Sequence, residues 1–146
     1  MRIERTVRTP TALPTVFAYL SDFTTTTEWD PGTVRTVRES GNGGTGTRYR
    51  NTSRFAGRET ELVYVVERLE ENRVIALRGE NATVVAHDEM TFRALGPDGQ
   101  GGTEVTYVAD FDFKGLTRFI APLLAPALKK LGDEAERGMR EALDRL

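Results

Sequence analysis

Hydrophobic and polar residues alternate along much of the chain, a pattern that predicts β-strands with one buried and one exposed face. The first such stretch covers residues 2–8 and ends at Pro10, since proline cannot donate a backbone hydrogen bond. Alternation returns between residues 33 and 113, where short glycine-rich and asparagine-rich segments separate the strands. These six strands are expected to begin near Val34 and then to cover 47–55, 59–69, 73–79, 83–95 and 103–113. Seven strands joined mostly by short turns predict an antiparallel meander.

Three segments show helical spacing instead. Residues 13–20 and 23–29 predict two short helices after the first strand, and the last 30 residues predict a long amphipathic helix. Pro122 and Pro126 are expected to kink the first half of this last helix or to delay its start. The apolar stripe of the last helix includes Leu116, Phe119, Ile120, Leu123, Leu124, Leu128 and Leu131.

This order of elements predicts an α+β fold in a single domain spanning 1–146. The sheet must bury one face, and the apolar stripe of the last helix offers a matching surface. A strongly twisted sheet of seven strands is expected to curl around that helix. A curved sheet that does not close leaves an apolar hollow between sheet and helix, and such hollows commonly bind ligands.

The same order resembles the helix-grip fold of the START/Bet v 1-like (SRPBCC) superfamily, and more narrowly the polyketide cyclase/dehydrase-like proteins. The resemblance covers nearly the whole chain. It rests on the final helix and on residues 3–7 with Pro10, 16–22, 29–32, 46–49, 57–59 and 102–107. These families include ligand carriers, lipid and hormone binders, aromatase/cyclases and coenzyme Q-binding proteins, so the resemblance implies a fold and does not select one activity.

Composition excludes several kinds of site. The chain has no cysteine, which excludes disulfides and thiolate metal ligands, and its one histidine, His87, excludes a zinc site built from several histidines. We therefore expect no metal and no cofactor. The balance of 20 basic and 22 acidic residues, with a net charge of −2, argues against nucleic-acid binding.

The chain also lacks the patterns of secretion and of membrane insertion. Its first residues are charged and alternating, unlike the apolar core of a signal peptide. No stretch approaches the 18 or so apolar residues of a spanning helix. We expect a cytoplasmic protein without stable membrane insertion, either a monomer or a homodimer.

Asp88 is the candidate with the clearest chemical meaning. It shares strand parity with Val84, Ala86, Met90 and Phe92, so the two-residue period of a strand directs its side chain inward. A carboxyl group in an apolar hollow is expected to have a raised pKa and to serve as an acid or a base. The alternative is that the strand bends there or that Asp88 pairs with a nearby arginine.

Tyr107 is the second candidate for proton transfer, because its phenol suits contacts with an enol or a carbonyl group. Its parity points inward, whereas Tyr64 is expected to face solvent or an edge. His87 has the parity of the outward set and is expected to face solvent, unless a β-bulge reverses its direction.

A set of mostly apolar side chains is expected to line the hollow and contact a ligand. Its members are Phe17, Trp29, Tyr49, Asn51, Phe55, Met90, Phe92, Phe111, Ile120, Leu124 and Leu128. The alternative is that these residues simply pack as core. For Asn51, and for Ser53 beside it, the alternative is that strand 47–55 is an edge with no true inside. Trp29 is expected either to gate the mouth of the hollow or to plug it.

The favoured hypothesis is a binding module for an apolar or aromatic small molecule, such as a lipid, a polyketide or an isoprenoid-like compound. One alternative is an enzyme of the polyketide cyclase or dehydratase type, with Asp88 and Tyr107 as its acid–base residues. Another is a protein-interaction or coenzyme Q-binding module. The sequence leaves the choice among them open.

Overall fold

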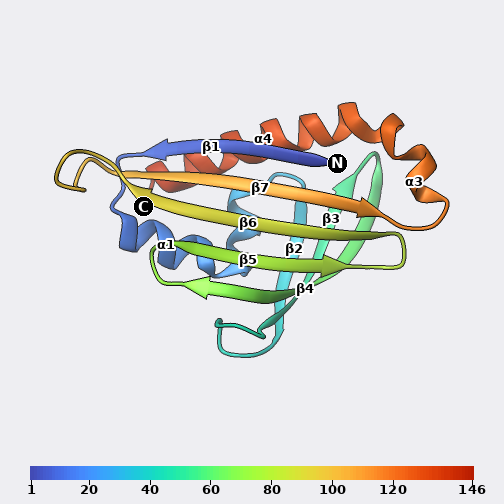
Figure 1. The fold of residues 1–146 in the computed structure, drawn as a ribbon, viewed down its shortest axis with the longest axis horizontal. Coiled ribbons are helices and arrows are strands. Elements are labelled where there is room, and N and C mark those ends of the chain that lie inside the picture. The colour runs from blue at the N-terminus through green and yellow to red at the C-terminus, as the bar shows by residue number, and fades with distance from the viewer.

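The computed structural model describes residues 1–146, and a single curved antiparallel sheet of seven strands dominates it (Figure 1). The strands follow the order β1-β7-β6-β5-β4-β3-β2, so the first strand pairs with the last. The remaining six form the predicted meander. They are β1 (Arg2–Thr9), β2 (Thr33–Ser40), β3 (Arg48–Phe55), β4 (Arg58–Glu70), β5 (Val74–Glu80), β6 (Val84–Ala94) and β7 (Thr103–Phe113).

Short helices follow β1, as predicted. They are α1 (Leu13–Ser21), the 3-10 turn η1 (Phe23–Thr25) and α2 (Thr26–Trp29). The predicted long helix is divided into α3 (Thr117–Ile120), the 3-10 turn η2 (Ala121–Leu124) and α4 (Ala125–Asp144). Both divisions fall at prolines, because proline lacks the N–H group that continues a helical ladder. No helix combines the length and the hydropathy needed to cross a bilayer.

Helix α4 lies along the sheet and is fastened to β1 and α2 (Figure 1). The guanidinium of Arg5 on β1 donates to Asp133 of α4 over 2.9 Å and lies 3.8 Å from Glu136. Gly138 lets the helix approach α2 closely, since a Cβ atom there would collide with the carbonyl oxygen of Trp29. These contacts fix the half of α4 that faces α1 and α2.

The solid part of the core lies between that half of α4, α1 and the inner face of the sheet. Leu20, Ile75, Met139 and Leu143 are fully buried there. The α+β helix-grip architecture predicted from the sequence is therefore confirmed. Toward α3 the packing is less complete, and a cavity takes the place of the core.

Candidate functional site

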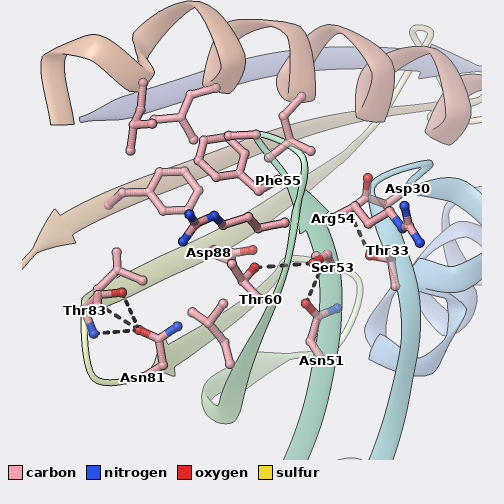
Figure 2. A pocket seen from close by; sticks show the side chains of 18 of the residues that line it. Asp30, Thr33, Asn51, Ser53, Arg54, Phe55, Thr60, Asn81, Thr83 and Asp88 are labelled. Atoms are coloured by element: carbon pink, nitrogen blue, oxygen red, sulfur yellow. Dashed lines mark hydrogen bonds between the residues drawn. The ribbon is translucent and has the colours of Figure 1, made fainter. Parts of the chain in front are cut away.

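A cavity of about 480 Å³ lies between the inner face of the sheet and the α3–α4 region (Figure 2). More than half of its lining residues are hydrophobic. Phe55, Phe111 and Phe113 supply aromatic rings, while Ile120 and Leu128 cover it from the helical side. The volume lies within the roughly 300–1,000 Å³ that is usual for small-molecule sites.

Asp88 is the most deeply buried carboxyl group in this cavity, with 4% of its surface exposed. Its Oδ2 atom accepts a hydrogen bond of 2.6 Å from the Tyr107 hydroxyl, and its Oδ1 atom has no partner. Burial raises its pKa from 3.8 to about 7, although the Tyr107 hydrogen bond lowers it. Since Tyr107 is its only side-chain partner, the alternative of an arginine pair is wrong. At neutral pH the group exists both as an acid and as a carboxylate.

The tyrosine hydroxyls around Asp88 are both buried. Tyr107 donates its proton to Asp88, and burial followed by the Asp88 charge holds its pKa well above 10. Tyr64 is 7% exposed and lines the cavity, so the prediction that it faces solvent or an edge is wrong. It lies opposite Gly79 on β5, where a Cβ atom would stand only 2.6 Å from the Tyr64 ring. The missing side chain of Gly79 therefore makes room for the Tyr64 ring.

A chain of hydrogen bonds runs along the β2–β3 wall of the cavity, which Asn51 and Ser53 line. The Ser53 hydroxyl donates to the side-chain oxygen Oδ1 of Asn51 over 2.7 Å. The side-chain Nδ2 of Asn51 donates to the Thr36 hydroxyl over 2.8 Å. The hydroxyl oxygens of Thr36 and Thr26 are 2.6 Å apart, and the Thr26 hydroxyl donates to the backbone carbonyl of Phe23. Most of the hydrogen-bonding capacity of Asn51 is thus used within the protein. Because β3 lies between β2 and β4 and Asn51 is buried, the alternative of an edge strand is wrong.

Trp29 and Asp30 form the wall where α2 ends. The Trp29 ring meets Tyr107 edge-on with centroids 6.0 Å apart, and its buried Nε1–H has no acceptor. With 2% of its surface exposed, Trp29 is buried in the inner wall of the cavity, where a plug is expected. Asp30 accepts hydrogen bonds from the Gly32 amide and the Thr33 hydroxyl, and burial raises its pKa. The negative charge of the Asp30 carboxylate also raises the pKa of Asp88.

A family model described as polyketide cyclase / dehydrase and lipid transport matches residues 1–146. The chain belongs to this family. No curated protein sequence matches it.

Several solved structures share the fold of this chain. The Zhui aromatase/cyclase from a Streptomyces species is 17% identical, with a TM-score of 0.82 over 99% of this chain and 94% of that one. A START superfamily protein from Mycobacterium smegmatis is 20% identical, with a TM-score of 0.73 over 99% of this chain and 94% of that one. A protein from Thermus thermophilus is 14% identical, with a TM-score of 0.77 over 98% and 95%. At these identities the likeness shows the fold alone.

Within this family fold, the structure separates the predicted acid–base residues and the predicted ligand-contacting residues into two groups. The first group lines the cavity and consists of Trp29, Asn51, Phe55, Asp88, Tyr107, Phe111, Ile120, Leu124 and Leu128. The second group belongs to the solid core and does not line the cavity: Phe17, Tyr49, Met90 and Phe92. The Phe17 ring, for example, packs edge-on against Phe92 with centroids 5.0 Å apart. Helix α1 and the end of α4 fill that part of the hollow.

The only histidine and the acidic residues form no further site. His87 faces outward, as expected, with 48% of its side chain exposed and its Nε2 atom 3.8 Å from Asp112. No group of His, Asp or Glu side chains is arranged to hold a metal ion. Sequence reasoning gave Tyr64 the wrong direction and did not single out Asp30. The glycine opposite Tyr64 and the Asp-Pro-Gly turn at Asp30 are the signals that point to them.

Proposed function

We propose that this protein binds an apolar small molecule that carries at least one polar group. The observation that carries the proposal is the buried Asp88–Tyr107 pair in a cavity that is otherwise mostly apolar. Burying a carboxyl group with an unpaired oxygen is costly, and a core built only for stability would place an apolar side chain there. The same cavity offers ring surfaces from Phe55, Phe111 and Phe113.

The polar groups define how such a molecule would be oriented. Asp88 donates a hydrogen bond when protonated and accepts one when ionised, and its pKa of about 7 populates both forms near neutral pH. The Tyr107 hydroxyl uses its proton in the hydrogen bond to Asp88, so the Tyr107 oxygen can only accept a hydrogen bond from the ligand. Tyr64 has no hydrogen bond to another side chain, and its hydroxyl remains a donor. A hydroxyl or carbonyl group of the ligand would meet these three residues, with the rest of the molecule against the phenylalanine rings.

Native mass spectrometry after gentle purification, followed by calorimetric titration with naphthol, tests the binding proposal. We expect a retained molecule or a titratable site of one naphthol per chain. Leu124→Trp, which fills the cavity, should weaken binding at least about tenfold. Leu123→Trp adds the same bulk to an outward side chain that is 80% exposed, and it should bind as the wild type does.

If no molecule is retained and naphthol does not bind, the binding proposal is wrong. A protein-interaction role without a small molecule would then be favoured. Equal affinities of the Leu124→Trp and Leu123→Trp variants would show instead that naphthol binds outside the cavity.

The second candidate function is acid–base catalysis on the bound molecule, and the observation that favours it is the position of Asp88. Ring closure followed by loss of water needs a group that removes a proton from carbon and returns it to a leaving hydroxyl. A buried carboxyl group with a pKa of about 7 is suited to both steps. The aromatase/cyclase from Streptomyces has the same fold, which makes this class of reaction the first to assay.

Asp88→Asn separates the two functions, because it keeps the size of the side chain and removes its ability to carry a proton. If the protein is a carrier, the Asp88→Asn variant should still bind the molecule recovered from the wild type. The mass of that molecule should then stay the same after incubation with the wild type or with the variant. An enzyme should convert the molecule with loss of the mass of water, and the Asp88→Asn variant should bind it without conversion.

A further inference from the structure

Four large apolar side chains gather in one exposed segment at the helical rim of the cavity. Leu116, Phe119, Ile120 and Leu123 are 83%, 67%, 50% and 80% exposed, respectively. Leu116 precedes α3, Phe119 and Ile120 belong to α3, and Leu123 belongs to η2, at the end of the molecule where β7 finishes (Figure 1). We call these four residues the rim patch. Exposed apolar groups this concentrated mark a surface that meets another apolar phase.

The sequence segment that carries the rim patch is basic, although the whole chain is slightly acidic. Between residues 113 and 132 there are four basic residues and no aspartate or glutamate, whereas the full chain has a net charge of −2. Two of the basic residues are ion-paired, Lys114 with Glu80 and Lys130 with Glu134, whereas Arg118 and Lys129 form no ion pair. The guanidinium of Arg118 lies 5.0 Å from the centre of the Phe119 ring, so charge and apolar surface are adjacent. This surface is complementary to one that is negatively charged outside and apolar beneath.

We propose that the rim patch docks on an anionic phospholipid bilayer. The patch consists of side chains that project from a short, irregular segment, a shape suited to insertion among lipid chains. Its basic neighbours are suited to the phosphate and carboxylate groups of the lipid surface. A second copy of the chain is a poorer occupant, because a two-fold contact would bring the same basic residues of both copies together.

The rim patch is continuous with the mouth of the cavity. Ile120 belongs to both, since it lines the cavity and is half-exposed, and Leu124 follows the patch directly and faces inward. Phe55, on the β3–β4 hairpin, also lines the cavity (Figure 2), as does Arg58 on the same hairpin. Docking through the rim patch would therefore set this end of the cavity against the lipid. The docking itself does not depend on the proposed ligand, because adsorption to a vesicle requires no occupied cavity.

Co-sedimentation of the full chain with lipid vesicles tests the docking proposal. We expect binding to vesicles of phosphatidylcholine mixed with phosphatidylserine, little binding to phosphatidylcholine alone, and weaker binding as salt is added. Leu116→Ser combined with Leu123→Ser should reduce the partition coefficient by about tenfold or more, since each leucine contributes at least that order when buried. Val34→Ser combined with Val37→Ser is the matched control. Those valines on β2 are 48% and 49% exposed, and their loss should leave partitioning unchanged.

Charge reversal supplies a second test of the same proposal. Lys129→Glu combined with Lys130→Glu should remove the preference for phosphatidylserine while the thermal transition by circular dichroism stays near that of the wild type.

Three results would overturn the docking proposal. One is a wild-type protein that sediments with neither kind of vesicle. Another is a Leu116/Leu123 double variant that partitions as the wild type does. The third is a concentration-dependent dimer, seen by light scattering, that disappears in the double variant, because it would assign the rim patch to a second copy of the chain. Naphthol titration of the same variants should be unaffected, so failure of docking and failure of the proposed binding function can be distinguished.

Discussion

The pH dependence of stability gives a direct test of the environment of Asp88. Burial raises the pKa of Asp88 from 3.8 to about 7 in the folded protein, whereas the unfolded chain leaves the group in water. The folded state therefore holds the proton over a pH range in which the unfolded state has released it. Stability falls with rising pH wherever the folded state binds more protons, so the wild type should lose stability between about pH 4 and about pH 7. Above that range both states are ionised and the loss levels off.

The magnitude follows from the same two pKa values. Each pH unit between them contributes at most about 1.4 kcal/mol, and the slope is smaller near either end. From about pH 5 to about pH 7 the free energy of unfolding should therefore fall by about 2 kcal/mol on account of Asp88. Asp88→Asn removes the titrating group and keeps an acceptor for the Tyr107 hydroxyl. The difference in unfolding free energy between this variant and the wild type should rise by the same 2 kcal/mol.

Urea denaturation, followed by the fluorescence of Trp29, measures this difference at each pH. Trp29 is the only tryptophan and is 2% exposed, so its emission reports the loss of the buried site. Comparing the slopes with pH cancels any constant offset that the new amide introduces. Glu89→Gln on the solvent face of the same strand is the control and should show a much smaller change. A difference for Asp88→Asn that stays constant within about 0.5 kcal/mol across this range would refute a raised pKa at Asp88.

Three further changes test the packing around the site. Gly138→Ala should destabilise the protein by about 1–3 kcal/mol in urea, because the methyl group collides with the Trp29 carbonyl, although helix propensity alone favours alanine by about 1 kcal/mol. Tyr107→Phe should raise the Asp88 pKa further, since its hydrogen bond lowers that pKa, and a carboxyl ¹³C NMR titration would detect the shift. Ala56→Asn should stabilise the protein by about 0.5–1 kcal/mol in urea, because Ala56 has a φ of 52°, which asparagine tolerates better.

The parity of β6 and β7 predicted their inward faces correctly because the two strands pair without interruption. The register runs continuously from Val84 opposite Phe113 to Ala94 opposite Thr103. The two-residue period of a strand therefore gives the correct direction for the side chains of Asp88 and Tyr107. The direction of both side chains was accessible from the sequence alone, whereas their 2.6 Å hydrogen bond depends on how the two strands are aligned.

Strand β4 shows why the same counting failed for Tyr64. Its pairing with β5 shifts register between Val66 and Arg68, and one extra residue in a strand reverses the face that follows. Leu69 and Tyr64 consequently pack toward the same interior despite opposite parity. Parity that is counted back from Leu69 directs Tyr64 to solvent. Parity that is counted from Leu62 and Val66, which lie before the shift, directs Tyr64 inward.

The division between core and cavity lay beyond sequence reasoning for a different reason. Met90 and Asp88 belong to the same strand face, yet Met90 is packed solidly and Asp88 meets the cavity. Parity defines which face of the sheet a side chain occupies, and it carries no information on which part of that face a helix covers. That distinction depends on where α1 and the second half of α4 pack against the sheet, which is a property of the tertiary structure.

The prolines of the last segment connect the cavity with the rim patch. A continuous helix would have turned one apolar stripe toward the sheet along its whole length and filled the hollow. Pro122 and Pro126 divide the segment into a short helix, a 3-10 turn and α4, so neighbouring apolar side chains take different directions. Leu124 turns into the cavity while Leu123 beside it is 80% exposed. The same interruption that leaves space for a ligand thus exposes the apolar side chains at its entrance, and the two features arise together from two residues.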